Sequence, residues 1–316
     1  RQINVERLDL PDAYALPALQ DLFLAWLAEH ERDEVALNVT GGTKPMAIAA
    51  QEAFRTAGKA VFYVSVETDN LVWLDRQRPT VKLETDVPLR SFLRVHGMSV
   101  LSGEAHSRLS PEWETFSLEL GLVKAAPWER ALGKLNYHAM EAEYRDVLDM
   151  GRIPADGCPY WDDLMQSLYY NEIIRDPARL YFKSPQARAF ANGGWFEHLV
   201  FDALKDIDSV RQPLLNAQVQ DARGNRNEWD AAFLSRNRLF LVECKTKRLD
   251  GAGPAAEAIY KLDALRKAGG LRTCGVLVSF RPVRDEDKHR AEAIGIAVID
   301  QSGLPRLKEL LSAAIR

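Results

Sequence analysis

Three residues about two-thirds of the way along the chain have side chains suited to binding a metal ion. Asp230 lies in one short apolar run, and Glu243 and Lys245 lie in the next, within the segment NEWDAAFLSRNRLFLVECKTKR. Carboxylate oxygens are the ligands that hard divalent cations such as Mg²⁺ and Mn²⁺ prefer. A lysine beside them offsets part of their negative charge. The residue types therefore favour a charge-compensated acidic site.

The two apolar runs are predicted to form a β-hairpin. If residues 235–238 make a four-residue loop, the strand positions pair so that Asp230 lies opposite Glu243. Because side chains alternate along a strand, Asp230, Glu243 and Lys245 share one face, with Glu228 opposite Lys245. Like charges directly opposed across a sheet are destabilising, so this face needs a cation. The other face takes the apolar side chains of Phe233, Phe240, Val242 and Cys244.

A second interpretation of the hairpin needs no chemistry. A surface hairpin often carries Glu and Lys on its solvated face, where opposite charges pair across strands. The run LFLV, residues 239–242, argues for burial because it is apolar on both faces. Buried carboxylates require partners.

A glycine-containing loop near the front is a candidate anion site. The predicted strand Glu34–Val39 leads into Thr40, Gly41, Gly42, Thr43 and Lys44, and a helix is predicted from Pro45. The glycines allow close backbone approach, and the helix amides and threonine hydroxyls can donate to phosphate. The pattern is neither GxxxxGK[ST] nor GxGxxG, and glycines also serve simply to turn the chain.

Length and composition indicate a globular protein of two or three domains. The chain has 316 residues, of which 47% are hydrophobic, and a net charge of −4, which is not typical of a nucleic-acid-binding protein. The basic clusters KTKR, LRKAGGLR and RPVRDEDKHR are either solvated surface or contacts to a phosphate backbone. Three separated cysteines favour neither a disulfide framework nor a zinc site.

The chain is expected to be cytoplasmic and free of the membrane. No apolar stretch reaches the length of a membrane span, and no signal peptide opens the sequence. The first residue is Arg1 rather than Met, so we expect a piece of something longer.

Alternating strand and helix patterns divide the chain into three segments of an α/β protein. Residues 1–84 read as one α/β domain, in which a helix is predicted over Leu16–Glu29. Residues 85–184 read as a mostly helical linker or a winged-helix-like region. Residues 185–316 read as a second α/β domain with the order helix, hairpin, helix, strand, strand, helix.

The motifs together resemble one family. NVTGGTKPM near the front, and EWD followed by ECK near the back, resemble the type III CRISPR ancillary nucleases. These proteins join an N-terminal CARF domain, a Rossmann-like sensor of cyclic oligoadenylate, to a C-terminal restriction-endonuclease-like PD-(D/E)xK domain. GGWFEHLV and IYKLDALRKAGG belong to the same resemblance. Only about one strand–helix unit precedes NVTGG, so the N-terminal part of the sensor is expected to be missing.

The resemblance implies roles for particular residues. Glu197, Asp230, Glu243 and Lys245 match the catalytic positions, and the three carboxylates match the metal ligands. Thr40, Gly41, Gly42, Thr43 and Lys44 match the loop that binds cyclic oligoadenylate. Tyr260 and Lys261 match a segment that touches substrate phosphate, with a packed tyrosine beside a solvated lysine as the alternative.

The resemblance also implies a function. The expected protein is a homodimeric endonuclease of antiviral defence, dependent on Mn²⁺ or Mg²⁺ and activated by cyclic oligoadenylate, with cyclic tetra-adenylate as the favoured activator. Its expected substrates are single-stranded DNA, RNA or both, with nicking of supercoiled duplex DNA. The alternative is a ligand-responsive nucleic-acid-binding regulator without nuclease activity, and an ungated nuclease is a third hypothesis.

Overall fold

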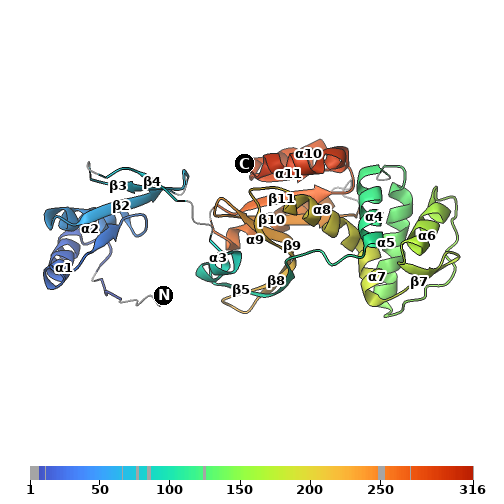
Figure 1. Cartoon of the computed structure of the whole chain (residues 1–316), viewed down its shortest axis with the longest axis horizontal. Helices are drawn as coiled ribbons and strands as arrows, with labels where there is room; N and C mark the ends of the chain where they lie inside the picture. Colours follow the sequence, from blue (N-terminus) through green and yellow to red (C-terminus); the bar gives the residue numbers. More distant parts are fainter. Residues whose placement is uncertain are drawn as a thin grey trace. The chain divides into compact units, whose positions relative to one another are not determined.

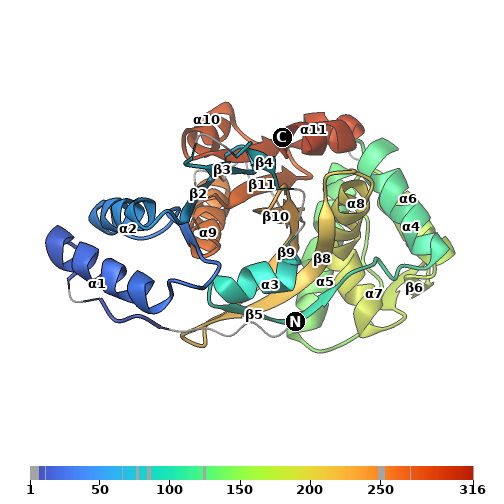
Figure 2. The ribbon, with the colours of Figure 1, turned by 60° about the vertical axis from the view of Figure 1, so that its left-hand side comes forward.

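The computed structural model of the chain describes residues 7–10, 12–65, 67–75, 78–83, 87–123, 126–247, 253–270 and 272–315. The chain divides into two compact units, Arg1–Thr85 and Asp86–Arg316. Figures 1 and 2 show the elements of each unit from two directions. Among the helices of the described residues, none is both long and apolar enough to cross a membrane.

The first unit is a four-stranded sheet with two helices. The strand order is β1-β2-β3-β4, with β1 and β2 parallel and the later pairs antiparallel. Helix α1 has the predicted bounds, and it packs side by side with α2 (Figure 1). The elements are α1 (Leu16–Glu29), β1 (Ala36–Asn38), α2 (Lys44–Thr56), β2 (Ala60–Ser65), β3 (Asn70–Trp73) and β4 (Val81–Lys82).

The second unit is built on a six-stranded mixed sheet. Its order is β12-β11-β10-β9-β8-β5, in which β5, β8, β9 and β10 pair antiparallel and β10, β11 and β12 pair parallel. The strands are β5 (Met98–Glu104), β8 (Arg211–Asp221), β9 (Arg226–Ser235), β10 (Arg238–Lys245), β11 (Cys274–Ser279) and β12 (Ile296–Ile299). A separate two-stranded sheet pairs β6 (Ile174–Asp176) with β7 (Arg179–Phe182).

Helices surround this sheet. The α-helices are α3 (Leu89–Val95), α4 (Pro111–Leu118), α5 (Glu129–Tyr144), α6 (Trp161–Tyr170), α7 (Pro185–Ala189), α8 (Trp195–Lys205), α9 (Pro254–Ala268), α10 (Asp285–Ala293) and α11 (Leu307–Ala314). Two π-helical turns, η1 (Glu119–Val123) and η2 (Phe190–Gly194), and a 3₁₀-helix, η3 (Gln301–Arg306), complete the unit.

The alternation predicted for the hairpin is present in the packing. Phe233, Phe240 and Val242 pack in the core that includes Phe196 and Val200 of α8. The intervening residues Leu234, Leu239 and Leu241 pack instead with Ile259 and Leu262 of α9. Since the side chains of Asp230, Glu243 and Lys245 follow the second set in register, they fall on the face that α9 covers.

The predicted hairpin loop was wrong in length but right in register. The strand pairs include Ser235 with Arg238 and Leu234 with Leu239, so the turn has two residues rather than four. Those two, Arg236 and Asn237, have φ of 49° and 55°. Positive φ at both positions is the geometry of the two-residue turns that match strand twist.

Two strands of the main sheet were absent from the prediction. Strand β8 was unassigned, and β5 lies in the segment 85–184, which was read as a helical linker or winged-helix-like region. That segment does hold α3, α4, α5 and α6, but β5 pairs with β8 at the edge of the sheet. The hydrophobic alternation of β5 is weak because most of its side chains are exposed.

Candidate functional site

The candidate site lies where the β9–β10 ladder ends. Paired residues run from Ser235–Arg238 to Ala231–Val242, and Asp230 and Glu243 are the next pair in that register. Asp230 does not continue the ladder, because its Oδ2 accepts a hydrogen bond from the backbone N–H of Cys244 at 2.6 Å. The strands thus present two carboxylates at the point where backbone pairing stops.

Glu243 is almost fully buried and is held by two lysines. Glu243 is only 1% exposed. Its Oε1 accepts from Lys245 Nζ at 2.5 Å and from Lys261 Nζ of α9 at 3.1 Å. A buried carboxylate needs such partners, and here two ammonium groups provide them.

Lys245 stays charged in this setting. Burial lowers the pKa of its ammonium group, but the charge of Glu243 and the hydrogen bond to it outweigh burial, so the pKa lies above its usual value. Lys245 is therefore a cation and not a general base at neutral pH.

Glu197 comes from α8 and joins the strand carboxylates. It lies in the first turn of α8, next in sequence to the fully buried Phe196 and on the same helix as the fully buried Val200. Burial, then the charges of Asp230 and Glu228, raise the pKa of Glu197 to about 8. Burial and the charge of Glu243 likewise raise the pKa of Asp230 to about 6. The predicted carboxylates are thus close enough to repel one another.

The side chains are not arranged as a closed metal cage. Over the stretches of chain that the structure describes, no group of three or more His, Cys, Asp or Glu is placed to hold a metal ion. Lysines engage Glu243, and a backbone amide engages Asp230. The donor chemistry nevertheless fits a hard divalent cation, since three mutually repelling carboxylates are stabilised by concentrated positive charge.

A cavity of about 560 Å³ opens at this site. Glu197, Lys245 and Lys261 line it, so helices α8 and α9 and the end of β10 meet there. Sequence reasoning missed Glu257, which lies one turn before Lys261 on α9 and lines the same cavity. Their i, i+4 spacing is the signal that could have found it.

Tyr260 lies differently from its neighbour Lys261. It is 55% exposed on α9 and does not line this cavity. Successive helix residues point about 100° apart, which separates the two side chains. Of the predicted substrate pair, only Lys261 lies in the cavity.

The front loop, residues 40–44, connects β1 to α2 in the first unit. The Thr43 hydroxyl caps the helix by accepting from Met46 N at 3.3 Å. Thr40 Oγ1 accepts from Val64 N at 2.7 Å, which ties the loop to β2. Gly42 has a φ of 83°, which explains a glycine there.

Gly41 and Lys44 are exposed in this loop, and a Cβ at Gly41 would meet no atom within 4 Å. That glycine leaves open space in front of the N-terminal end of α2. The loop thus places an exposed lysine and open space at the start of α2, although the amides of Met46 and Ala47 already donate to Thr43. The anion site predicted at this loop stays a prediction.

The chain thus joins an α/β unit that carries this loop to a second unit whose strands carry the D…ExK residues, with Glu197 on the adjacent helix α8. Residues 4–89 match the family model of the Card1 CARF domain. Residues 184–316 match the family model of the Card1-like endonuclease domain. These matches confirm the predicted pairing of an N-terminal CARF domain with a C-terminal nuclease domain.

Two solved structures are similar over nearly the whole chain. Protein VC1899 from Vibrio cholerae is 28% identical with a TM-score of 0.83, covering 97% of this chain and 83% of that one. Can2 from Sulfobacillus thermosulfidooxidans, solved in complex with cyclic tetra-adenylate, is 24% identical with a TM-score of 0.80, covering 96% and 82%. No curated protein matches the sequence.

Proposed function

We propose that the protein is a metal-dependent endonuclease switched on by cyclic oligoadenylate. The observation that carries the proposal is the meeting of Glu197, Asp230 and Glu243, from α8, β9 and β10, beside the charged Lys245. Ionisable groups that raise one another's pKa beside a cavity are a recognised mark of a functional site. The match to a Card1-like endonuclease domain supports the same conclusion.

The three carboxylates would hold one or two Mg²⁺ or Mn²⁺ ions. A divalent ion at such a site supplies an activated water and offsets the charge that develops on the phosphate. Lys245, kept protonated by Glu243, would stabilise the pentacovalent phosphate or orient the attacking water. Lys261, the more exposed of the two lysines, would release Glu243 and contact a substrate phosphate.

The first unit would act as the sensor. Thr40, Gly41, Gly42, Thr43 and Lys44 would receive a phosphate of the activator at the start of α2. The fold likeness to Can2, which is solved with cyclic tetra-adenylate, supports that ligand as the activator to test first. A cyclic molecule with repeated units suits a two-fold symmetric site, so the active form would be a homodimer acting in the cytoplasm.

The test is cleavage with matched controls. Supercoiled plasmid, single-stranded DNA and single-stranded RNA are incubated with Mn²⁺ or with EDTA, each with and without cyclic tetra-adenylate, alongside the Glu243→Ala variant. We expect cleavage by the wild type only with activator and metal, and none by the variant.

The other outcomes separate the competing functions. No cleavage in any arm would support the ligand-responsive regulator. Equal cleavage with and without the activator would support the ungated nuclease. The relative rates on DNA and RNA define the substrate preference.

A further inference from the structure

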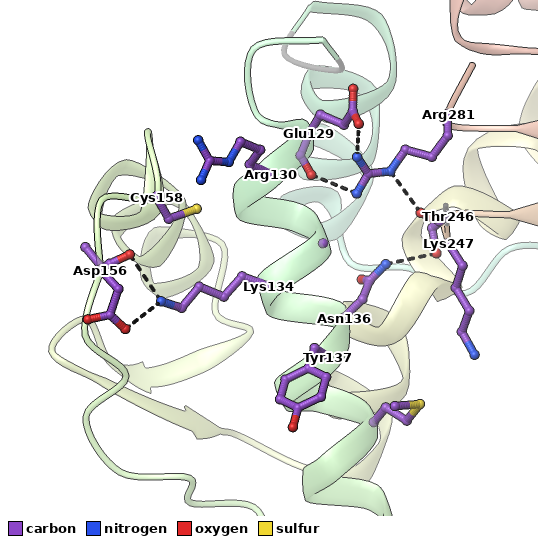
Figure 3. A pocket seen from close by; sticks show the side chains of 13 residues that line it. Glu129, Arg130, Lys134, Asn136, Tyr137, Asp156, Cys158, Thr246, Lys247 and Arg281 are labelled. Atoms are coloured by element: carbon purple, nitrogen blue, oxygen red, sulfur yellow. Dashed lines mark hydrogen bonds and ion pairs between the residues drawn. The ribbon is translucent and has the colours of Figure 1, made fainter. Parts of the chain in front are cut away.

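A second cavity lies next to the candidate site and belongs to no predicted function. It has a volume of about 760 Å³, within the range of roughly 300–1,000 Å³ typical of ligand pockets. Figure 3 shows α5 forming one wall, while Thr246 and Lys247 face it from the chain that follows β10. Thr246 and Lys247 also line the cavity that holds Glu197 and Lys245, so the two cavities adjoin.

Buried polar contacts fix this wall to the candidate site. Arg281 is 5% exposed, forms an ion pair with Glu129, and donates to the carbonyl oxygens of Glu129 at 2.8 Å and Thr246 at 3.3 Å. Asn136 Nδ2 donates to Thr246 Oγ1 at 3.0 Å (Figure 3). A Cβ at Gly133 would lie 2.8 Å from an Arg281 nitrogen, so this glycine makes room for the arginine. Helix α5 is thus tied to the residue that follows Lys245.

The cavity carries an excess of positive charge. Arg281 pairs with Glu129, and Lys134 pairs with Asp156 at 3.5 Å. Arg130 and Lys247 also line the cavity and are exposed, and neither has an ion-pair partner in the part of the chain that the structure describes. Unpaired cations along a groove are the usual phosphate contacts of strand-binding proteins.

An exposed aromatic ring lines the cavity together with these cations. Tyr137 of α5 lines the cavity and is 58% exposed (Figure 3). Helix residues four apart lie on one face, and Gly133 and Tyr137 have that spacing. An exposed ring in a cavity that also carries unpaired cations is the combination on which nucleic-acid bases stack without regard to sequence.

We propose that this cavity binds a nucleotide of single-stranded nucleic acid flanking the phosphate that is cleaved. Its base stacks on Tyr137, and Arg130 and Lys247 bind the adjoining phosphates. This inference rests on the proposed nuclease function and gives the otherwise unassigned helix α5 a role in substrate selection. Bases in a duplex are already stacked and paired, so the cavity favours single strands.

The test measures binding apart from cleavage. Full-length Glu243→Gln protein, with Mg²⁺ and cyclic tetra-adenylate, is titrated against fluorescent 20-nucleotide strands of thymidine or uridine, and Kd is read by anisotropy. Tyr137→Ala should raise Kd by roughly 5- to 100-fold, while Tyr137→Phe should not. Tyr144→Ala is the matched control, because Tyr144 is on the same helix, 91% exposed and outside the cavity lining. Lys247→Ala should lower the slope of log K against log salt by about 0.7.

A strand of abasic nucleotides gives the second measurement. Without bases, binding to the Glu243→Gln protein should weaken, and Tyr137→Ala should cause no additional loss. An equal effect of Tyr137→Ala on abasic and thymidine strands, or a Kd like that of Tyr144→Ala, would overturn the inference.

These results separate the two proposals. Wild-type protein that cleaves nothing refutes the nuclease function, while the binding measurements still report on Tyr137. Wild-type protein that cleaves, with Tyr137→Ala binding and cleaving like Tyr144→Ala, refutes the nucleotide subsite alone.

Discussion

At the scale of single residues, the site depends on charges that cannot all be satisfied by the chain itself. Glu197 and Asp230 have raised pKa values because burial and neighbouring carboxylates disfavour their ionised forms. Two lysines form ion pairs with Glu243, and lysine charge offsets only part of the rise in pKa at Glu197 and Asp230. A divalent ion would relieve all three carboxylates at once, which is the physical reason to assign them as its ligands.

Glu243→Gln should lower the cleavage rate by at least about 100-fold, because the amide keeps the side-chain shape and removes a ligand charge. Single-turnover cleavage of a labelled single strand measures the rate. Glu292→Gln is the control, since Glu292 is exposed on α10. Similar rates for the two variants would remove Glu243 from the catalytic set.

The two lysines should differ in how much they contribute to the cleavage rate. Lys245→Ala should reduce the rate by about 100-fold, because this partly buried ammonium group is held at the carboxylates. Lys261→Ala should cost about tenfold or less, since its side chain is 55% exposed and exposed pairs contribute little. Rates measured at saturating substrate separate the two, and the reverse order would contradict the assigned roles.

At the scale of elements, the site depends on how helix η2 enters α8. Gly193 has a φ of 115°, and a Cβ there would lie 3.0 Å from Thr246 Oγ1. The glycine therefore lets this bend lie against the chain that follows Lys245. A side chain at position 193 would both strain the backbone and displace Thr246.

Gly193→Ala should lower both the free energy of unfolding, by about 1–2 kcal/mol, and the cleavage rate. Gly151→Ala is the control: Gly151 also has positive φ, at 73°, but a Cβ there meets nothing within 4 Å. Urea unfolding and cleavage are measured on both variants. Loss of stability without a greater loss of activity in Gly193→Ala would mean that Thr246 is not displaced.

Asp300 holds the end of the sheet and should give stability a pH dependence. Burial raises the pKa of its carboxyl, but hydrogen bonds from Lys288, Ser302 and Val283 outweigh burial and leave the pKa below its usual value. A lowered pKa in the folded state adds stability that is complete above the unfolded pKa of about 3.8–3.9 and is lost as pH falls through the folded pKa.

Asp300→Asn should therefore cost about 2 kcal/mol at pH 7 and less at pH 3. Urea unfolding at both pH values measures the difference from wild type. An equal cost at pH 7 and pH 3 would show that the charge of Asp300 does not stabilise the fold.

Sequence reasoning predicted the parts of the fold that local patterns determine. The hairpin register was predicted by centring the turn between Leu234 and Leu239, and that pairing is confirmed even though the loop length was wrong. Strand β5 could not be found this way, because its exposed side chains show little pattern and only pairing with β8 makes it a strand. Likewise, Glu257 and Tyr137 can be identified as candidate site residues only from the structure, which places them in the linings of two cavities.

At the scale of the whole molecule, the proposed sensor loop and the proposed active site lie in separate compact units. An activator that binds one unit changes activity in the other only if it binds the active and inactive states with different affinity. A stimulation of tenfold requires about 1.4 kcal/mol of such a difference. Gated activity therefore requires only a modest difference in binding free energy between the two states.

Removing the positive charge and the helix cap of the front loop, residues 40–44, should abolish gating but not folding. Thr43→Ala combined with Lys44→Ala should reduce stimulation by cyclic tetra-adenylate at least tenfold, because Thr43 caps α2 and Lys44 is exposed beside it. Cleavage is measured across activator concentrations. The control is Lys59→Ala, whose Nζ donates to carbonyls of Glu31 and Asp33 away from this loop. Unchanged stimulation would contradict activator binding at the loop.

The most direct test of the central claim is a crystal structure of the full chain grown with Mn²⁺, with anomalous scattering used to locate the metal. We predict an anomalous peak bounded by oxygens of Glu197, Asp230 and Glu243, with Lys261 moved away from Glu243. A map with no peak there, and with both lysines still bonded to Glu243, would contradict the account.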